Sequence, residues 1–325
     1  MAAPIALSSD ELRAVGRGDP VVRILPTKDD RDVAVFGIVA IAASREAVAS
    51  SLADESASPP TGRAAVGTLR DPAVAADFAG VVLSRRDAGS LRNCRPGSCA
   101  FKLAAGEMAR LRTILDRSDD TVQALRFEQR RLATIANEYR QFGNDAMPVY
   151  DDYDSRSVRG GPAFAALVVE SPNLYRFAPG LREYLLGYPR VLLPGSSNEL
   201  YWVREELPGM RPTTILNHRI AYSPGGVPGV TIVATKEIVA DHYLEAALEV
   251  AVVIDQPFLT GRGVCVMFMR RYRFDQIPRA FGISLRGRVV AKLRDRAMAD
   301  LLRERNRFDV VPAATHSLTA HRPTH

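Results

Sequence analysis

The sequence contains none of the short motifs that identify nucleotide-binding enzymes and the common hydrolases. No Gly-x-Gly-x-x-Gly turn follows a predicted strand, and there is no phosphate loop, no Gly-x-Ser-x-Gly elbow and no His-Glu-x-x-His pair. Such motifs supply backbone amides for a pyrophosphate, an exposed nucleophile or two metal ligands. We therefore expect no cofactor and no standard hydrolase mechanism, and the sequence leaves open whether the protein is an enzyme.

Long apolar runs are also missing. The apolar segments, such as residues 33–41, 230–233 and 250–254, have the length of strands, whereas a helix that crosses a bilayer needs about 20 apolar residues. The opening Met-Ala-Ala-Pro-Ile-Ala lacks the basic and apolar segments of a signal peptide. The same residues would suit a position just after a cleavage site, so the sequence leaves the compartment open.

Cysteine is scarce, with three residues in the chain. Cys94 and Cys99 enclose the turn sequence Arg-Pro-Gly-Ser, so their thiols are expected at the neck of a tight loop, where a disulfide is geometrically reasonable. That bond would favour a periplasmic or secreted protein, and free thiols a cytoplasmic one. Without a second pair or a nearby histidine, the two cysteines make a poor zinc site. Cys265 lies in an apolar run and is expected to be buried.

Positive charge is concentrated near the end of the chain. The formal net charge is +6, and residues 279–307 hold nine Lys or Arg against three acidic residues. A basic helix of this kind contacts anionic lipid or nucleic acid, and the candidates for phosphate contact are Arg286, Arg288, Lys292 and Arg294. The alternative is a solvated face that keeps the protein soluble. Nucleic acid ranks last as a partner, because no aromatic residues are interleaved with these arginines.

Apolar patterning predicts a mixed α and β protein. The expected strands are 33–41, 78–83, 100–103, 200–207, 213–222, 231–243, 248–254 and 264–272. The expected helices are 44–53, 105–117, 118–142, 164–169, 181–186 and 281–302. Residues 54–66 are expected to form a loop, residues 147–153 an extended segment, and residues after Val310 a disordered tail. The last five strands predict an antiparallel meander, on which the amphipathic terminal helix would pack.

Three segments resemble the START-related lipid-transfer and polyketide-cyclase-like proteins. Phe36-Gly-Ile-Val-Ala-Ile-Ala-Ala-Ser-Arg-Glu-Ala-Val is similar to their first strand and helix, residues 201–272 to their meander, and residues 281–302 to their terminal helix. The resemblance implies an α+β fold in which a curved antiparallel sheet grips a long C-terminal helix. It implies one domain over residues 20–308, with a helical insertion at about 104–190 and a disordered tail at 309–325.

The same resemblance implies a class of function. In such folds the sheet and the long helix enclose a cavity lined by alternate strand residues. We therefore expect binding or transfer of an apolar, lipid-like molecule, with the terminal helix at an anionic membrane surface and the insertion as a lid. The alternative is a cyclase, dehydratase or hydrolase that uses the same cavity. The Cys-Arg-Pro-Gly-x-Cys loop is also similar to that of bacterial proteins with no assigned activity.

Titratable residues are densest in the predicted strand 231–243. Strict alternation would place Lys236 and His242 on one face and Tyr243 on the other. His242 would act as a general base and Tyr243 as a proton donor if both faced a cavity, and the alternative is an ordinary cross-strand hydrogen-bond network. His218, on the neighbouring strand, would approach His242 in a hairpin, but the usual metal-ligand spacing is absent and we expect no metal.

Two further clusters are candidates for binding. Tyr201 and Trp202, together with Lys236, His218 and His242, are the candidate ligand-binding residues, with burial of the aromatic pair in the core as the alternative. The acidic residues 151–154 superficially resemble a calcium loop but lack its turn glycine and its closing glutamate. A solvated loop is expected there.

Overall fold

The computed structural model describes residues 5–54, 63–117, 121–154, 156–171, 175, 178–206, 210–256, 263–275, 279–280, 283–284 and 286–309. Within this part of the chain one antiparallel sheet has eight strands, in the order β1-β2-β10-β9-β8-β7-β6-β3. Their bounds are β1 Val21–Leu25, β2 Asp32–Ile41, β3 Arg63–Thr68, β6 Ser197–Glu205, β7 Thr213–Tyr222, β8 Val230–Ala240, β9 Leu244–Asp255 and β10 Val264–Phe274. The protein therefore has the predicted α+β class, with a large antiparallel sheet and a C-terminal helix.

The meander predicted from residues 200–272 is confirmed. Strands β6 to β10 follow one another in the sheet as they do in the sequence, each antiparallel to the next. Strand β2 adds to the outer side of β10, and β3 to the outer side of β6. All ten residues of β2 are buried, which agrees with its continuous apolar sequence, because a strand covered on both faces needs no polar side.

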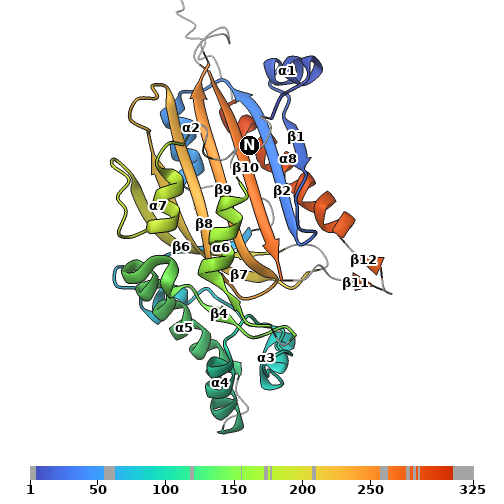
Figure 1. Cartoon of the computed structure of the whole chain (residues 1–325), viewed down its shortest axis with the longest axis vertical. Coiled ribbons are helices and arrows are strands. Elements are labelled where there is room, and N and C mark those ends of the chain that lie inside the picture. The colour runs from blue at the N-terminus through green and yellow to red at the C-terminus, as the bar shows by residue number, and fades with distance from the viewer. Residues whose placement is uncertain are drawn as a thin grey trace, which may run out of the picture.

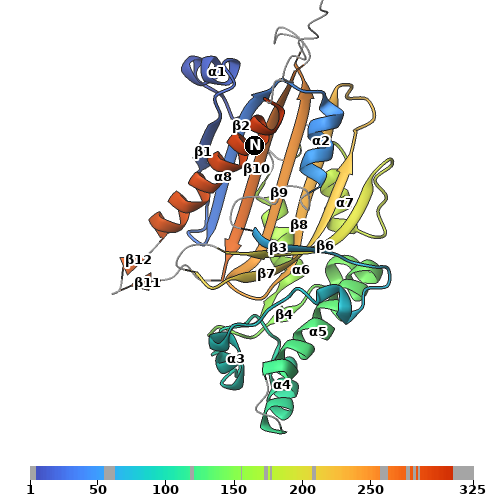
Figure 2. The ribbon, with the colours of Figure 1, turned by 180° about the vertical axis from the view of Figure 1, so that it is seen from behind.

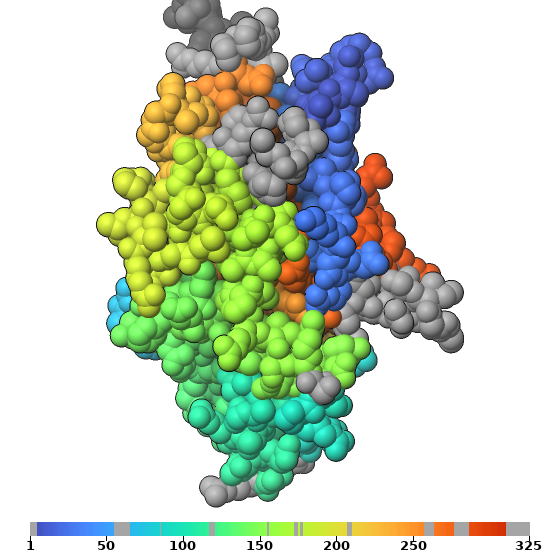
Figure 3. Space-filling model, viewed as in Figure 1, coloured from blue at the N-terminus to red at the C-terminus, as the bar shows by residue number. Residues whose placement is uncertain are grey.

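Helices cover both faces of the sheet. Figure 2 shows α2 (Arg45–Ala53) and α8 (Arg286–Phe308) on one face. Figure 1 shows α6 (Gly160–Val169) and α7 (Leu181–Gly187) on the other, with α5 (Thr121–Phe142) below them. In the space-filling view the chain from about α5 to α7 forms much of the surface over this second face (Figure 3).

Alternate strand residues supply two separate cores. We call them the α6 core, which contains Phe164, Trp202 and Ile232, and the α8 core, which contains Tyr201, Val253 and Leu293. Adjacent residues of one strand thus lie in different cores, as the pleat of a strand requires.

Shorter elements complete the described chain. They are α1 Ser9–Gly16, η1 Ala75–Phe78, α3 Arg85–Arg92, α4 Ala105–Arg117, η2 Gly143–Ala146, β4 Val149–Tyr150, β5 Val158–Arg159, β11 Arg279–Ala280 and β12 Ile283–Ser284.

Helix α5 ends at Phe142, as predicted. The next residue, Gly143, has a φ of 61°, and a Cβ on it would lie 1.8 Å from the Tyr188 carbonyl oxygen. Among the described residues, no helix has the length and apolarity needed to cross a bilayer.

Four element predictions need correction. Residues 78–83 and 100–103 form no strand, because Phe78, Phe101 and Leu103 are apolar through burial in cores rather than through sheet pairing. Residues 63–66, expected in a loop, belong to edge strand β3. The terminal helix begins at Arg286 rather than Phe281, after the short β11–β12 pair. Residues 55–62, Phe281 and the tail from Val310 lie outside the described residues.

Candidate functional site

A bulge in β8 changes which residues of this strand lie on the same face of the sheet. Leu216 of β7 pairs with Val239, whereas Asn217 pairs with Glu237, so Ile238 is an extra residue on β8. Such a residue shifts the side chains that follow it to the other face. The strand also ends at Ala240, and residues 241–243 form the turn into β9. The prediction that Lys236 and His242 share one strand face is therefore wrong.

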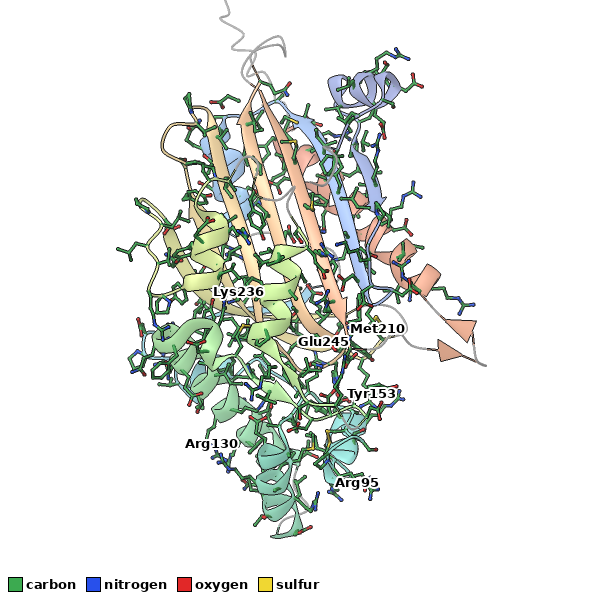
Figure 4. All side chains as sticks on the ribbon, in the orientation of Figure 1. Arg95, Arg130, Tyr153, Met210, Lys236 and Glu245 are labelled. Atoms are coloured by element: carbon green, nitrogen blue, oxygen red, sulfur yellow. A yellow bond between two sulfur atoms is a disulfide. The ribbon has the colours of Figure 1, made fainter. Side chains whose placement is uncertain are left out.

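Lys236 is fully buried against the helices that cover the α6 core (Figure 4). Its Nζ donates to the Tyr139 hydroxyl at 3.1 Å and to Oδ1 of Asn144. The same atom lies 4.6 Å from the ring centre of Tyr139 and 4.3 Å from that of Phe164. Among the described residues no carboxylate forms an ion pair with it. Burial therefore lowers the pKa of Lys236 well below its usual value.

His218 lies directly opposite Lys236 in the β7–β8 register, not near His242 as predicted. Its Nε2 lies 2.8 Å from Oδ1 of Asn198, which accepts hydrogen bonds only, so we assign the proton to Nε2. Its Nδ1 then accepts from the Tyr139 hydroxyl at 2.9 Å. Burial, followed by the nearby Lys236, lowers the pKa of His218 to about 3, so the imidazole is neutral.

These residues form one hydrogen-bonded chain, which we call the Lys236 network. Its members are Asn144, Lys236, Tyr139, His218, Asn198 and Tyr184, whose hydroxyl also donates to Asn198. Burial raises the pKa of Tyr139 well above its usual value. Burial in this network therefore disfavours the charged forms of Lys236, Tyr139 and His218. The aromatic surrounding is completed by Tyr188, whose ring centre is 4.6 Å from that of His218.

A groove of about 500 Å³ lies beside this network. We call it the α6 groove, and it is lined by Asn144, Asp145, Met147, Val149, Arg159, Gly161, Pro162, Ala165 and Leu186. Helix α6 packs closely on η2 there, since a Cβ on Gly161 would lie 2.3 Å from the Asn144 carbonyl oxygen. Asn144 belongs both to the groove wall and to the Lys236 network. A single side chain thus connects the groove with the buried amine.

The rim of the α6 groove carries one cation without a counter-ion in the described structure. Arg159 is exposed, and its side chain forms no hydrogen bond or ion pair with a described residue. Asp145, on the same rim, pairs with Arg190 at 3.4 Å. The walls between them are apolar, formed by Met147, Val149, Pro162, Ala165 and Leu186. The groove therefore combines apolar walls with a rim that carries Arg159 and the Asp145–Arg190 ion pair.

His242 and Tyr243 line a much smaller space at the end of the sheet. The His242 ring lies 4.5 Å from that of Phe101, and its Nδ1–H donates to the Ala100 carbonyl at 2.6 Å. Nε2 is buried without a hydrogen-bond partner among the described residues, 3.9 Å from Asp241 and 4.0 Å from Asp87. Burial lowers the pKa of this histidine. The adjoining space measures about 30 Å³, which is room for one water molecule.

The interface between α8 and the sheet is filled mainly by side chains. A second space there, between α2 and α8, measures about 60 Å³. Arg270 of β10 binds Asp300 of α8 at 2.6 Å, and Arg296 of α8 binds both carboxylate oxygens of Glu205 at 2.8 Å. The two spaces beneath α8 are too small for a lipid-like molecule in this conformation.

A cluster of buried charges lies near the β8–β9 turn. Lys102 approaches Asp275 at 3.3 Å and Asp152 at 3.7 Å. Burial raises the pKa of Glu237 to about 8 and that of Asp241 to about 7. The expectation of a solvated loop at residues 151–154 is wrong in part, because Asp152 is buried against Lys102 and the Asp151 carboxylate accepts from the Ala105 amide at 2.7 Å.

The remaining candidate ligand-binding residues, Tyr201 and Trp202, are packed in the two cores. Tyr201 is packed in the α8 core beneath Arg219, whose guanidinium carbon is 4.0 Å from the ring centre, and Trp202 is packed in the α6 core. Neither lines the α6 groove.

The basic candidates on α8 do not form one free patch. Arg286 donates to the carbonyl oxygens of Asp30 and Asp32, while Arg288 and Arg294 are exposed and Lys292 is half-buried.

Cys94 and Cys99 form a disulfide with an S–S distance of 2.07 Å, and Cys265 is buried, both as predicted.

Of the residues of this site, only Lys236 and His218 were predicted, and those missed include Tyr139, Asn144, Arg159 and Phe164. These four lie in the segment 139–164, whose apolar and polar residues fit ordinary helices and turns. The local signals were the glycine stop before Asn144 and the Gly160-Gly161-Pro162 sequence at the start of α6. Neither indicates which strand the segment covers.

The comparisons with known proteins return no relative. No protein-family model matches the chain, and a search of curated proteins finds no match.

Proposed function

We propose that the protein binds an apolar small molecule with one acidic group, such as a fatty acid, in the α6 groove. The proposal depends on one observation: the groove has apolar walls, and on its rim lies Arg159, which has no ion-pair partner among the described residues. The volume of about 500 Å³ lies within the range of about 300–1,000 Å³ in which proteins hold small ligands. The apolar chain would lie along Met147, Ala165 and Leu186, and the carboxylate would bind the Arg159 guanidinium.

The proposal keeps the lipid-like ligand expected from the START resemblance but changes its location. The support for a helix-grip arrangement is the β6–β10 meander followed by α8 packed on the sheet. In that arrangement residues 104–190 are the insertion, and its helices α6 and α7 cover the face of the sheet opposite α8 (Figures 1 and 2). We infer that the insertion provides the ligand site, because it contributes all nine residues of the groove lining. The exposed Arg288 and Arg294 support contact with an anionic membrane.

Calorimetric titration with dodecanoate and with dodecanol tests the proposal. A charge-assisted hydrogen bond contributes about 1.5 kcal/mol, so Arg159→Gln should weaken dodecanoate binding roughly tenfold and leave dodecanol unchanged. The matched control is Arg130→Gln, which removes an exposed arginine from α5 outside the groove (Figure 4). Ala165→Phe should fill the groove and abolish binding of both. Absence of saturable binding, or equal affinity in the two arginine variants, would contradict the proposal.

A further inference from the structure

The chain has four lysines, at positions 28, 102, 236 and 292, and two of them are buried. Lys102 is 1% exposed and lies between two carboxylates, at 3.3 and 3.7 Å. Lys236 is 0% exposed, and its hydrogen-bond partners among the described residues are the neutral oxygens of Tyr139 and Asn144. Burial favours the uncharged amine, and a carboxylate favours the ammonium ion. The two lysines therefore have similar burial and opposite electrostatic surroundings.

The hydrogen bonds of Lys236 match those of a free amine. A neutral amine has two N–H donors and one lone pair, whereas an ammonium ion has three donors. Two acceptors are present, because the Tyr139 proton is committed to Nδ1 of His218 and its oxygen is then free to accept from Nζ. The remaining direction of Nζ is bordered by the rings of Phe164 and Tyr139. Desolvation of this kind leaves an amine with its lone pair available as a nucleophile.

We propose that Lys236 forms an imine with an aldehyde or ketone that occupies the α6 groove. The geometry that carries this inference is the position of Asn144, which lines the groove and accepts from Nζ through Oδ1. To open Nζ to the groove, the Asn144 side chain must move and release its hydrogen bonds to the carbonyl oxygens of Leu185 and Leu186 at 3.0 and 3.1 Å. The inference depends on the α6 groove being a ligand site, and it narrows the ligand to a carbonyl compound with an apolar body.

The reaction requires no other reagent. The Nζ lone pair attacks the carbonyl carbon, and a proton moves from nitrogen to the carbonyl oxygen, which gives a carbinolamine. The nitrogen lone pair then expels that oxygen as water, taking the second amine proton, so the product is a C=N bond and one water molecule. The Tyr139 hydroxyl, 3.1 Å from Nζ and 2.9 Å from Nδ1 of His218, is positioned to transfer these protons.

Reductive trapping tests the inference on the full chain. The protein is treated with octanal and sodium cyanoborohydride at pH 7, digested, and each lysine peptide is examined by mass spectrometry for an added octyl group. An amine with the usual lysine pKa of about 10.4 is the free base in only about one part in 2,500 at that pH. We expect alkylation of Lys236 in preference to Lys28 and Lys292, and none at Lys102. The rate at Lys236 should rise less steeply between pH 6 and 8 than the rate at exposed amines, which gain about tenfold per unit, because burial lowers the pKa of Lys236.

Two variants and one competitor complete the experiment. Asn144→Ala should accelerate alkylation of Lys236, Lys236→Met should remove it, and dodecanoate should block it in the wild-type protein. Alkylation confined to Lys28, Lys292 or the α-amino group would overturn the inference, as would reaction at Lys236 only after Asn144→Ala. Dodecanoate binding without alkylation would overturn the imine alone and leave the proposed ligand site intact. Alkylation of Lys236 that dodecanoate does not block would support the reactive amine and contradict the groove as its entrance.

Discussion

Asp300 of α8 accepts a hydrogen bond of 2.6 Å from Arg270 of β10, beneath the C-terminal helix. Both residues are buried, and Arg270 also binds Glu249 of β9 at 2.8 Å. One turn earlier on the helix, Arg296 makes its two-point contact with Glu205. Helix α8 is therefore joined to the sheet by charged contacts as well as by the apolar residues Val289, Leu293 and Leu301.

The first prediction concerns this ion pair. Asp300→Asn should lower the free energy of unfolding by about 3 kcal/mol, because it removes one partner of a buried charge pair. Urea denaturation followed by circular dichroism measures the change. The control is Asp309→Asn, whose partner Arg305 is 3.3 Å away and whose side chain is 48% exposed, and it should cost less than about 1 kcal/mol. Similar midpoints for the two variants would contradict a role for the buried pair.

The second prediction concerns pH. Burial raises the pKa of Glu237 to about 8, whereas an unfolded glutamate titrates near 4.3. Between these values the native state keeps a proton that the unfolded state has released. Glu237 should therefore contribute a fall in stability as pH rises through this window, by up to about 1.4 kcal/mol per unit. Lys236 and His218, whose pKa values are lowered by burial, contribute with the opposite sign. Glu237→Gln should remove the Glu237 contribution, so that the stability measured by urea denaturation at pH 5 to 8 falls less, or rises more, with pH than in the wild-type protein.

The exposed Glu183 of α7 provides the control for this titration. Glu183→Gln makes the same chemical change at the surface and should leave the pH slope as in the wild-type protein. A Glu237→Gln protein with the wild-type slope would show that Glu237 does not retain its proton in the native state.

The third prediction concerns the disulfide. Replacing Cys94 and Cys99 together by serine should destabilise the protein by about 2 kcal/mol, as expected for a closed loop this short. The carbonyl of Ala100, next to Cys99, accepts from His242, so the histidine ring should also become less ordered. Thermal unfolding and the NMR line width of the His242 ring protons measure the two effects. Mild reduction of the wild-type protein should reproduce both, and unchanged His242 resonances would contradict the link between loop and ring.

The fourth prediction uses the single tryptophan. A Cβ on Gly67 of β3 would lie 2.2 Å from Nε1 of Trp202, so Gly67→Ala should cost about 1–3 kcal/mol and shift the tryptophan fluorescence. A Cβ on Gly89, within α3, would meet no packed neighbour within 4 Å, so Gly89→Ala should stabilise the protein by up to about 1 kcal/mol. Denaturant midpoints of the two variants should move in opposite directions.

Local patterns in the sequence predicted most of the elements. Strands β6 to β10 and the helices α5, α6 and α7 were recognised because their apolar spacing repeats over a few residues and ends at Pro or Gly. The edge strand β3 was missed because Arg-Ala-Ala-Val-Gly-Thr is small and not alternately apolar. Gly67 of this strand leaves room for the Trp202 ring of the neighbouring strand β6, and such a requirement cannot be seen in the sequence of β3 itself.

The candidate site could be predicted only in part. Lys236 and His218 were identified as candidates, but the bulge at Ile238 and the partners of Lys236 were not. Tyr139 is 79 residues from His218 and 97 from Lys236, and Lys102 is 173 residues from Asp275. A buried charge or hydroxyl requires a partner, but the requirement does not specify which distant residue supplies it. Residues 151–154 illustrate this limit, since the same acidic sequence would also suit a surface loop.

The separation of the two cores has a consequence for how the protein tolerates change. Tyr201 and Trp202 are neighbours in the chain, yet each side chain contacts the helices of only one face of the sheet. The backbone of β6 to β10 separates the two cores, so substitutions in the α6 core can accumulate without disturbing the packing of α8. Substitutions in the proposed ligand site would thus leave the opposite half of the molecule, with α8, unaltered.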